Sequence, residues 1–444
     1  MSRRRRRKKL PQGLFQADIH TLSHEGRGIA QINGKTTFID YALPNETVEF
    51  NYTDTRSKFD EGIVENVLNR SKTRQTPDCE YFGYCGGCSM QHLNAETQLQ
   101  HKQSVLMEQF EHIGNVNPEE ILSPLCGPTI GYRHKARLAV KHVTKKERTL
   151  VGFRERRSPF VADINSCVVL HPKVGKNLPL LSELISSLSN FDQIPQIEIA
   201  VSDNTTALVF RHLTPFTGSD LEKMKLFQIK YDFRLYLQPG GYDTIHRLDE
   251  EPDQSLQYSL PDYNLTMSFL PTDFTQINIE INRQMINKAI SYLELNPEDR
   301  VLDLFCGIGN FTLPLATIAG KVIGVEGDAG LIERAKANAQ NNNIDNIDFH
   351  VADLAAKEMI YPFMQQHYSK LLLDPARTGA KEIIQALNLK DIELIVYVSC
   401  NPATLARDAG ILVHEKSYRL CQAGIMDMFP HTSHVESIAV FKKQ

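Results

Sequence analysis

The first stretch of the chain alternates short hydrophobic runs with turn residues. Between residues 10 and 68, five runs rich in β-branched and aromatic side chains are separated by turn signals such as Asn33-Gly34 and Pro44-Asn45. Short strands at this spacing are typical of a small β-barrel of the oligonucleotide-binding type. The strands are expected at 14–19, 28–32, 36–39, 47–52 and 62–67.

The middle of the chain has a weaker pattern. Residues 70–77 are polar and predict a linker, whereas 94–113 predict a helix because Leu99, Leu106 and Phe110 fall on one face. Beyond residue 131 the pattern favours strands, with one helix expected over 178–189. These strands are expected at 136–140, 151–153, 196–201, 207–211 and 233–238.

From residue 280 onward, strand and helix patterns alternate. This alternation predicts a mostly parallel sheet with helices on both faces, a Rossmann-like α/β fold. The strands are expected at 301–305, 322–326, 347–351, 370–374, 394–399 and 438–441, and the helices at 281–293, 330–341 and 403–412. We therefore expect a multi-domain protein with a basic arm at 1–9, a β-barrel at 10–70, a mostly β central domain at 71–265 and the α/β domain at 266–444.

The net charge of −4 is unevenly distributed along the chain. Residues 1–9 contain seven basic side chains and no acidic one, and residues 131–157 contain ten basic and two acidic side chains. The rest of the chain is acidic. The two basic segments therefore predict a polyanionic partner, although the arm by itself is equally typical of a solvated tail.

No segment of the sequence is typical of a membrane or secreted protein. The apolar runs are short, as at 394–398, whereas a membrane helix needs about 18 apolar residues or more. The basic start is followed by Leu10-Pro11-Gln12-Gly13, so no secretory signal is expected. Eight cysteines in 444 residues are too few for a disulfide scaffold. We expect a cytoplasmic protein without a membrane partner, in which grouped cysteines bind metal or perform chemistry.

A glycine-containing loop follows the first strand of the predicted α/β domain. Residues 303–311 read Asp-Leu-Phe-Cys-Gly-Ile-Gly-Asn-Phe, and the two glycines let a ligand approach the backbone. Glu326 ends the next strand, where a carboxylate can bind a ribose diol, and Asp353 follows the third strand, where it can contact an adenine amino group. Thr312 stands where a dinucleotide fingerprint has its third glycine. A nucleoside cofactor without a phosphate, such as S-adenosyl-L-methionine, fits this pattern.

A cysteine and two carboxylates are predicted at one edge of this sheet. Cys400 follows a strand, Asp374 ends another, and Glu436 stands just before the last strand. A thiol there can add to C6 of uracil, which makes C5 nucleophilic enough to take a methyl group, and a carboxylate can then remove the C5 proton. Because Cys400 acts first, we expect it to be substantially a thiolate, and the helix predicted to start just after it would help, since a helix N-terminus favours negative charge. Cys306 is expected to face the cofactor instead.

Four further cysteines form a second group. Cys79, Cys85 and Cys88 lie close together among several glycines, and Cys167 follows 79 residues after the third. Thiolates in this number bind zinc or an iron–sulfur cluster. The spacing is not that of a paired zinc ribbon, which favours the iron–sulfur cluster.

These motifs together resemble the RNA uracil-C5-methyltransferase family over nearly the whole chain. The resemblance is carried by 303–311, 373–377, 399–408 and 430–436. Within the family, the chain is similar to the bacterial branch that acts on 23S rRNA and carries an N-terminal TRAM domain and a [4Fe-4S] cluster. Pro44-Asn45-Glu46 departs from the Pro-Gly-Glu that is usual in this TRAM module.

The resemblance implies a function and a set of site residues. It implies methylation of C5 of one uridine in 23S rRNA, with the TRAM barrel binding the RNA, no obligatory protein partner and a monomeric state. Cys400 would be the nucleophile and Glu436 the general base. The S-adenosylmethionine contacts would be Gln276, Phe305, Asn310, Glu326, Asp353 and Asp374, with Gln276 also touching the base, and the cluster ligands would be Cys79, Cys85, Cys88 and Cys167.

Other functions stay open at this point. The first is the same chemistry on another rRNA uridine or on tRNA, although tRNA enzymes of this family lack the TRAM module and the cysteine cluster. Cytosine-C5 methylation typically uses a second cysteine after a proline, where this chain has Asp374-Pro375-Ala376. A non-catalytic RNA-binding or ribosome-assembly protein would be expected to have lost Cys400 or Glu436, and both are present.

Overall fold

The computed structural model describes residues 10–249, 255–356 and 359–444. The chain divides into two compact units: the first contains residues up to Val105 together with Phe429–His434, and the second contains Leu106–Met428 and Val435–Gln444. The predicted basic arm at 1–9 lies outside the described residues. No helix in the described parts of the chain is long and apolar enough to cross a membrane.

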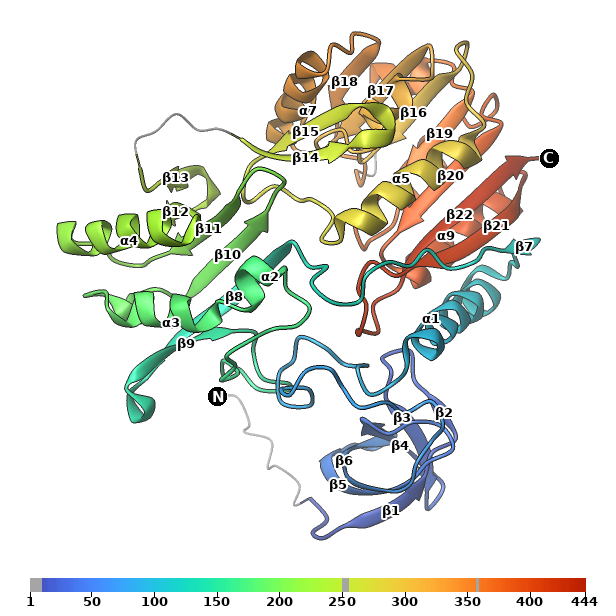
Figure 1. Ribbon diagram of the computed structural model, residues 1–444. Coiled ribbons are helices and arrows are strands. Elements are labelled where there is room, and N and C mark those ends of the chain that lie inside the picture. The colour runs from blue at the N-terminus through green and yellow to red at the C-terminus, as the bar shows by residue number, and fades with distance from the viewer. Residues whose placement is uncertain (1–9, 250–254, 357–358) are drawn as a thin grey trace, which may run out of the picture. The chain divides into compact units, whose positions relative to one another are not determined.

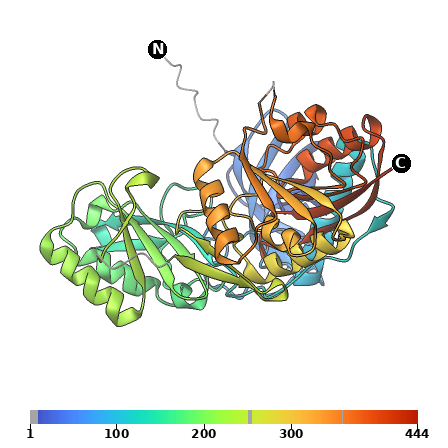
Figure 2. The ribbon, with the colours of Figure 1, turned by 90° about the horizontal axis from the view of Figure 1, so that it is seen from above.

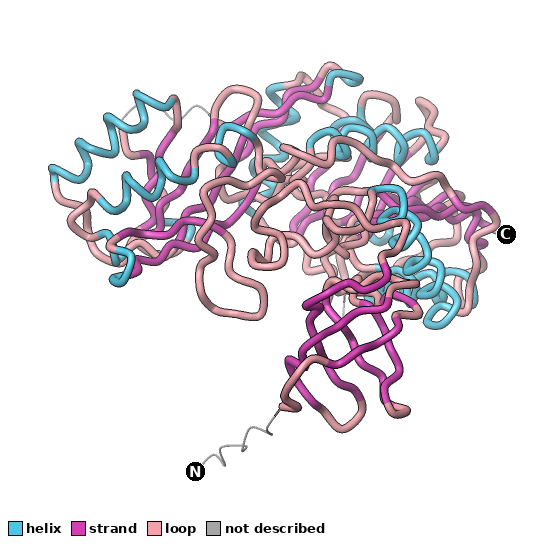
Figure 3. Tube along the Cα trace, turned by 60° about the horizontal axis from the view of Figure 1, so that its bottom comes forward, coloured by secondary structure: helices cyan, strands magenta, loops and turns pink. Residues whose placement is uncertain are grey.

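The first unit contains a six-stranded, strongly curled sheet. All five predicted strands are present, and Figure 3 shows them in magenta around a common centre. His20 N donates a hydrogen bond to Ile29 O at 3.0 Å, so the chain after the first strand reaches the third and curls the sheet. The strands are β1 (Phe15–Asp18), β2 (Thr21–Leu22), β3 (Gly28–Ile32), β4 (Lys35–Asp40), β5 (Thr47–Thr55) and β6 (Phe59–Asn69), in the order β1-β5-β6-β4-β3-β2.

The segment after β6 packs against this sheet and is not the linker expected at 70–77. Arg74 forms an ion pair with Glu46, with 2.6 Å between Nε and Oε1, and the Glu46 side chain is 0% exposed. The same carboxylate accepts hydrogen bonds from the backbone N–H groups of Leu43 and Ser71. A buried carboxylate needs such partners, and the polar residues of the segment supply them. The predicted domain boundary at 70/71 therefore does not coincide with the division of the chain into units.

The second unit begins within α1 (Ala95–Gln109). This helix continues as a π-helical turn at Phe110–Gly114, and the two together match the helix predicted at 94–113. The first sheet of the second unit is mixed and covers the region expected to be mostly β. The strands are β8 (Lys135–Val143), β9 (Arg148–Gly152), β10 (Gln196–Val201), β11 (Thr206–Arg211), β12 (Arg234–Gln238) and β13 (His246–Arg247), in the order β13-β12-β11-β10-β8-β9.

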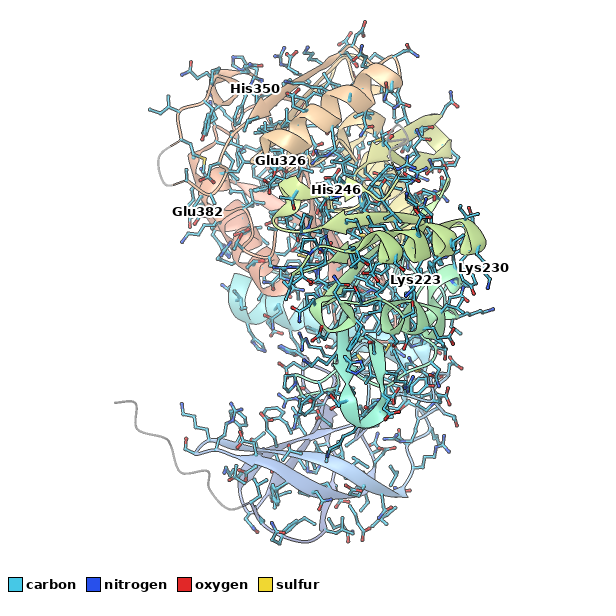
Figure 4. All side chains as sticks on the ribbon, turned by 90° about the vertical axis from the view of Figure 1, so that its left-hand side faces the viewer. Lys223, Lys230, His246, Glu326, His350 and Glu382 are labelled. Carbon is cyan, nitrogen blue, oxygen red and sulfur yellow. The ribbon has the colours of Figure 1, made fainter. Side chains whose placement is uncertain are left out.

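Short helices accompany this sheet: α2 (Pro172–Gly175), α3 (Leu178–Ser186) and α4 (Gly218–Tyr231). The sequence did not predict α4, although Thr217 and Asp220 form a capping box at its start. The hydrophobic pattern did not predict this helix because Leu226 and Ile229 are exposed, so its apolar residues do not all fall on one buried face. Lys223 and Lys230 of the same helix are labelled in Figure 4.

The C-terminal sheet has eight strands, and helices cover both of its faces (Figure 1 and Figure 2). Five neighbouring strands are parallel, as predicted, but the last strand of the chain, Glu436–Lys443, runs antiparallel to the strands on both sides of it, and the strand Tyr418–Met426 was not predicted. The strands are β7 (Glu120–Ile121), β16 (Arg300–Leu304), β17 (Lys321–Glu326), β18 (Ile347–Val351), β19 (Lys370–Leu373), β20 (Leu394–Ser399), β21 (Tyr418–Met426) and β22 (Glu436–Lys443), in the order β18-β17-β16-β19-β20-β22-β21-β7. The helices are α5 (Ile279–Leu293), α6 (Thr312–Ala316), α7 (Ala329–Asn341), α8 (Lys381–Ala386) and α9 (Pro402–His414).

A hairpin of β14 (Leu256–Leu260) and β15 (Leu265–Phe269) precedes α5. Asn338 on α7 and Asn342, which directly follows that helix, form side-chain hydrogen bonds with the backbone of Ser268 and Thr266, and these bonds fasten the hairpin to the helix. The predicted domain boundary at 265/266 falls inside this hairpin.

Candidate active site

A cavity of about 430 Å³ lies within the second unit, at the carboxyl ends of the parallel strands. This is where open α/β sheets bind their ligands. Seven of the eight residues that were predicted from the sequence to act in catalysis or cofactor binding line this cavity. They are Gln276, Phe305, Asn310, Glu326, Asp374, Cys400 and Glu436.

Asp353 is the nominated residue that is not among those lining the cavity. It follows β18 as expected and is exposed, and its carboxylate accepts a hydrogen bond from Ala355 N at 2.9 Å. Glu326, which does line the cavity, ends the neighbouring strand β17 and is labelled in Figure 4.

The glycine loop after β16 has the conformation that its sequence predicts. Gly307 and Gly309 have φ values of +56° and +92°, which residues other than glycine rarely adopt. A Cβ atom on Gly307 would meet no heavy atom within 4 Å, so this backbone faces open space. Gly307 N donates a hydrogen bond to Glu326 Oε2 at 3.2 Å, which ties the loop to the end of the next strand.

A network of buried polar groups holds Asn310 in this loop. Its Oδ1 accepts hydrogen bonds from Tyr258 Oη at 2.8 Å and from Asn282 Nδ2 at 3.0 Å, and its Nδ2 donates to Asn282 Oδ1 at 2.9 Å. Burial raises the pKa of Tyr258, so its hydroxyl stays a donor. These bonds determine which end of the Asn310 amide is the donor.

The sequence did not nominate Tyr258 or Asn282. For Asn282 the sequence did contain a signal, which is a polar residue among the apolar positions of α5. The structure shows that this amide is fully buried. A polar group in such a position needs a hydrogen-bond partner. Tyr258 lies in the region whose pattern was least informative.

Antiparallel pairing of β20 with β22 brings Cys400 and Glu436 to one place. Ser399 pairs with Ser437, so Cys400, which directly follows β20, and Glu436, the first residue of β22, lie at the same edge of the sheet. The Asn401 side chain caps α9 by accepting a hydrogen bond from Ala403 N at 3.1 Å. The sequence predicted that both groups reach this edge, but it did not predict the antiparallel register that makes them neighbours.

The surroundings of Cys400 do not favour the thiolate, contrary to the expectation from sequence. Burial, Glu436 and Asp374 raise the pKa of Cys400 to about 11, and Arg377 opposes them. Two carboxylates and partial desolvation outweigh the start of α9, because both disfavour a negative charge on sulfur. The pKa of Asp374 is itself raised well above its usual range, by burial first and then by nearby carboxylates. An acidic cavity of this kind favours a positively charged ligand.

Cys306 lies in the same cavity but in different surroundings. It is buried, and burial raises the pKa of its thiol well above the ordinary value. Burial also raises the pKa of neighbouring Asp303 to about 7, although a hydrogen bond from Thr312 opposes this change. Cys306 is therefore a poorer candidate nucleophile than Cys400.

The four cysteines of the second group are divided between the two units. Cys79, Cys85 and Cys88 belong to the first unit and Cys167 to the second. Within residues 10–249, 255–356 and 359–444, no three Cys, His, Asp or Glu side chains form a group that could hold a metal ion. Gly87 N does donate a hydrogen bond to Cys85 Sγ at 3.4 Å. The cluster therefore remains a prediction.

The basic segment at 131–157 is partly neutralised by acidic neighbours. Arg137 pairs with Glu198, and Lys146 and Arg148 both pair with Asp163. Lys135, expected to contribute to the patch, is largely buried, and burial lowers its pKa to about 8. The exposed positive charge of this segment is smaller than its composition predicted.

The parallel sheet, the glycine loop after its first strand and the cavity at its carboxyl edge define the fold of the S-adenosylmethionine-binding methyltransferases. A solved structure with this fold, the Pyrococcus abyssi tRNA (uracil-54, C5)-methyltransferase in complex with S-adenosyl-L-homocysteine, superposes with a TM-score of 0.73 and 23% identity. The match covers 96% of this chain and 100% of that one.

Sequence comparison identifies the family. The profile of a family described as tRNA (Uracil-5-)-methyltransferase matches residues 249–444. Proteins named 23S rRNA (uracil(1939)-C(5))-methyltransferase RlmD are similar over the full length. The one from Nitrosococcus oceani is 52% identical over 445 residues, covering 100% of this chain and 99% of its own. The one from Francisella tularensis subsp. novicida is 50% identical over 453 residues, covering 100% of both. The chain belongs to the RlmD family of 23S rRNA (uracil-C5)-methyltransferases.

Proposed function

We propose that this protein transfers the methyl group of S-adenosyl-L-methionine to C5 of a uridine in 23S rRNA, the one equivalent to position 1939 in the names of its relatives. The observation that carries the proposal is the meeting of Cys400, Glu436 and the glycine loop in one cavity. A thiol, a carboxylate and a nucleoside-binding loop are the three groups that methylation of C5 of uracil requires.

In the proposed reaction, Cys400 reacts as the thiolate, its proton having passed to solvent, and its Sγ forms a bond to C6 of the uracil ring. The electrons of the C5–C6 double bond then make C5 the nucleophile, which takes the methyl group as the bond from the methyl carbon to the sulfonium sulfur of the donor breaks and leaves a thioether. The Glu436 carboxylate removes the C5 proton, the double bond re-forms and the bond from C6 to Cys400 breaks. When bound, S-adenosylmethionine supplies an electrophilic methyl group and a positive charge that offsets the carboxylates around the Cys400 thiol.

We assign the cofactor contacts to residues at the carboxyl edge of the sheet. Glu326, at the end of β17, is placed to accept hydrogen bonds from a ribose diol. Asn310 presents an amide that its buried partners hold in one orientation. We assign the remaining contacts to Gln276, Phe305, Asp353 and Asp374, and a contact to the target base also to Gln276.

We further propose that Cys79, Cys85, Cys88 and Cys167 hold a [4Fe-4S] cluster. Four soft thiolates suit iron, and N–H donors to sulfur are typical of cluster sites. Burial raises the pKa of Cys79, and two donors of this kind, the backbone N–H groups of Tyr81 and Phe82, oppose the change by hydrogen bonding to it. The purified protein should therefore contain iron and sulfide in the ratio of a cluster. Zinc without iron after anaerobic purification would contradict this assignment.

RNA binding is assigned to the β-barrel at 10–70, as a TRAM module, and to the exposed basic residues of 131–157. Lys141 and Lys145 are exposed, so their replacement by alanine should make the salt dependence of RNA affinity shallower by about two units in the log–log slope. An unchanged slope would show that they face away from the RNA. We expect the protein to act in the cytoplasm as a monomer, because no step above needs a second chain.

The test of the reaction compares variants of the two proposed catalytic residues. Cys400→Ala should abolish both the covalent protein–RNA conjugate and methyl transfer. Glu436→Gln should still transfer the methyl group but accumulate the conjugate in denaturing gels, because only the last proton transfer is lost. Cys306→Ala is the matched control, since it removes another thiol of the same cavity. Conjugate formation that depends on Cys306 and not on Cys400 would overturn the assignment.

Mass mapping of 5-methyluridine in RNA from a deletion strain identifies the substrate. Loss of the modification from 23S rRNA alone is the expected result. Loss from tRNA would show that the chemistry is right and the substrate is wrong.

A further inference from the structure

The loop that precedes Glu436 is held by the segment that follows Cys88. His431 O accepts hydrogen bonds from Ser89 N and from Met90 N, both at 2.9 Å. These residues all belong to the first unit, and only Val435 separates the end of this loop from Glu436.

The loop backbone is strained at the point where these bonds act. His431 is buried and has a φ of +65°, a left-handed conformation that costs free energy for a residue other than glycine. Strained residues of this kind persist only where the surroundings hold them, and they gather at functional sites. The hydrogen bonds to His431 therefore determine the path of the chain into β22.

One buried side chain on α1 joins the two segments. Gln98 Oε1 accepts a hydrogen bond from His431 N at 3.0 Å, while Gln98 Nε2 donates to Met90 O at 3.0 Å and to Leu93 O at 2.7 Å. Lys102, one turn later on the same helix, donates from Nζ to Phe429 O at 3.0 Å. Both side chains are almost fully buried.

We propose that Gln98 is a positioning residue for the step in which Glu436 removes the C5 proton, supported by Lys102. This inference rests on the proposed function. A general base must lie within hydrogen-bond reach of its proton, and a displacement of about 1 Å can cost about a hundredfold in rate. Gln98 holds the loop that leads to Glu436. Its loss should let this loop shift, and the shift should pass through Val435 to the Glu436 carboxylate.

Loss of Gln98 should affect only the removal of the C5 proton, because the nucleophile and the cofactor loop are positioned by other strands. Cys400 follows β20, and the glycine loop follows β16. The hydrogen bonds of the Gln98 side chain reach Met90, Leu93 and His431, and neither of these groups. Addition of the thiol and methyl transfer should therefore proceed, whereas release of the methylated RNA should slow.

The test measures methyl transfer and release separately in single turnovers of the full chain with an RNA fragment of 23S rRNA. Gln98→Leu should slow release by about tenfold or more and raise the fraction of enzyme in the conjugate, while the methyl-transfer rate changes by less than about twofold. The matched control is Gln100→Leu, which removes an exposed glutamine from the same helix, bonded to Glu96 Oε1 at 3.3 Å. It should behave like the unchanged protein.

A second variant keeps the inference testable if Gln98→Leu fails to fold. Lys102→Met preserves the aliphatic stem and removes the donor to Phe429 O, so it should slow release in the same way, to a smaller extent. Equal slowing of methyl transfer and release, or unchanged release in a variant that melts like the unchanged protein, would overturn the inference. If Glu436→Gln itself accumulates no conjugate, the proposed function has failed instead.

Discussion

The reactivity of Cys400 offers a direct test of how the cavity controls its nucleophile. The pKa of about 11, compared with an ordinary value of 9.0, results from burial, Glu436 and Asp374. At pH 8, a thiol with a pKa of 11 is about 0.1% thiolate, whereas one with a pKa of 9 is about 9% thiolate. Alkylation of Cys400 should therefore be about a hundredfold slower than that of an ordinary thiol, since only the thiolate reacts.

The perturbation is the removal of one negative charge from beside the sulfur. Glu436→Gln removes a carboxylate that disfavours the thiolate, so it should lower the pKa of Cys400. Asp374→Asn should lower the pKa of Cys400 less, because burial raises the pKa of Asp374 and so reduces its negative charge. Each unit by which the pKa falls makes alkylation about tenfold faster at pH 8. In the unchanged protein the rate should increase about tenfold per pH unit until the pH approaches 11.

The assay is alkylation with iodoacetamide at several pH values, with each cysteine peptide quantified by mass spectrometry. Cys126 is exposed and serves as the reference thiol within the same molecule. Cys400→Ala confirms the peptide assignment. If Cys400 is alkylated at pH 8 as fast as a free thiol, and neither substitution changes its rate, then burial and the two carboxylates do not control its ionisation.

Three further predictions concern the cofactor loop, the first unit and the cluster. Tyr258→Phe removes the hydroxyl that donates to Asn310, so the Kd for S-adenosylmethionine should increase about three- to tenfold, measured by calorimetry, and an unchanged Kd would contradict this role. Arg74→Met leaves the buried Glu46 carboxylate without its ion-pair partner and should cost about 3 kcal/mol in urea unfolding followed by circular dichroism; a loss below about 1 kcal/mol would show a solvated pair. Cys79→Ser should abolish bound iron in elemental analysis, and a full iron content would exclude this ligand.

The sequence by itself determined the local structure around the active site. Strand and helix periods placed the parallel sheet, and the two glycines marked the loop at its carboxyl edge. Cys400 and Glu436 could be identified as candidates because Cys400 directly follows a strand and Glu436 begins one, and a strand end is visible in the hydrophobic pattern. Such features depend on neighbours within a few positions, which is the range over which periodicity and turn chemistry act.

Only the tertiary structure determined how distant segments act on one another. Burial, then Glu436 and Asp374, raise the pKa of Cys400, and Arg74 forms an ion pair with Glu46, which lies 28 positions earlier in the chain. Gln98 bonds to His431, which is 333 positions away. None of these pairs has a periodic signature, because a hydrogen bond or a Coulomb interaction depends on distance in space and a hydrophobic pattern records only which face of one element is buried.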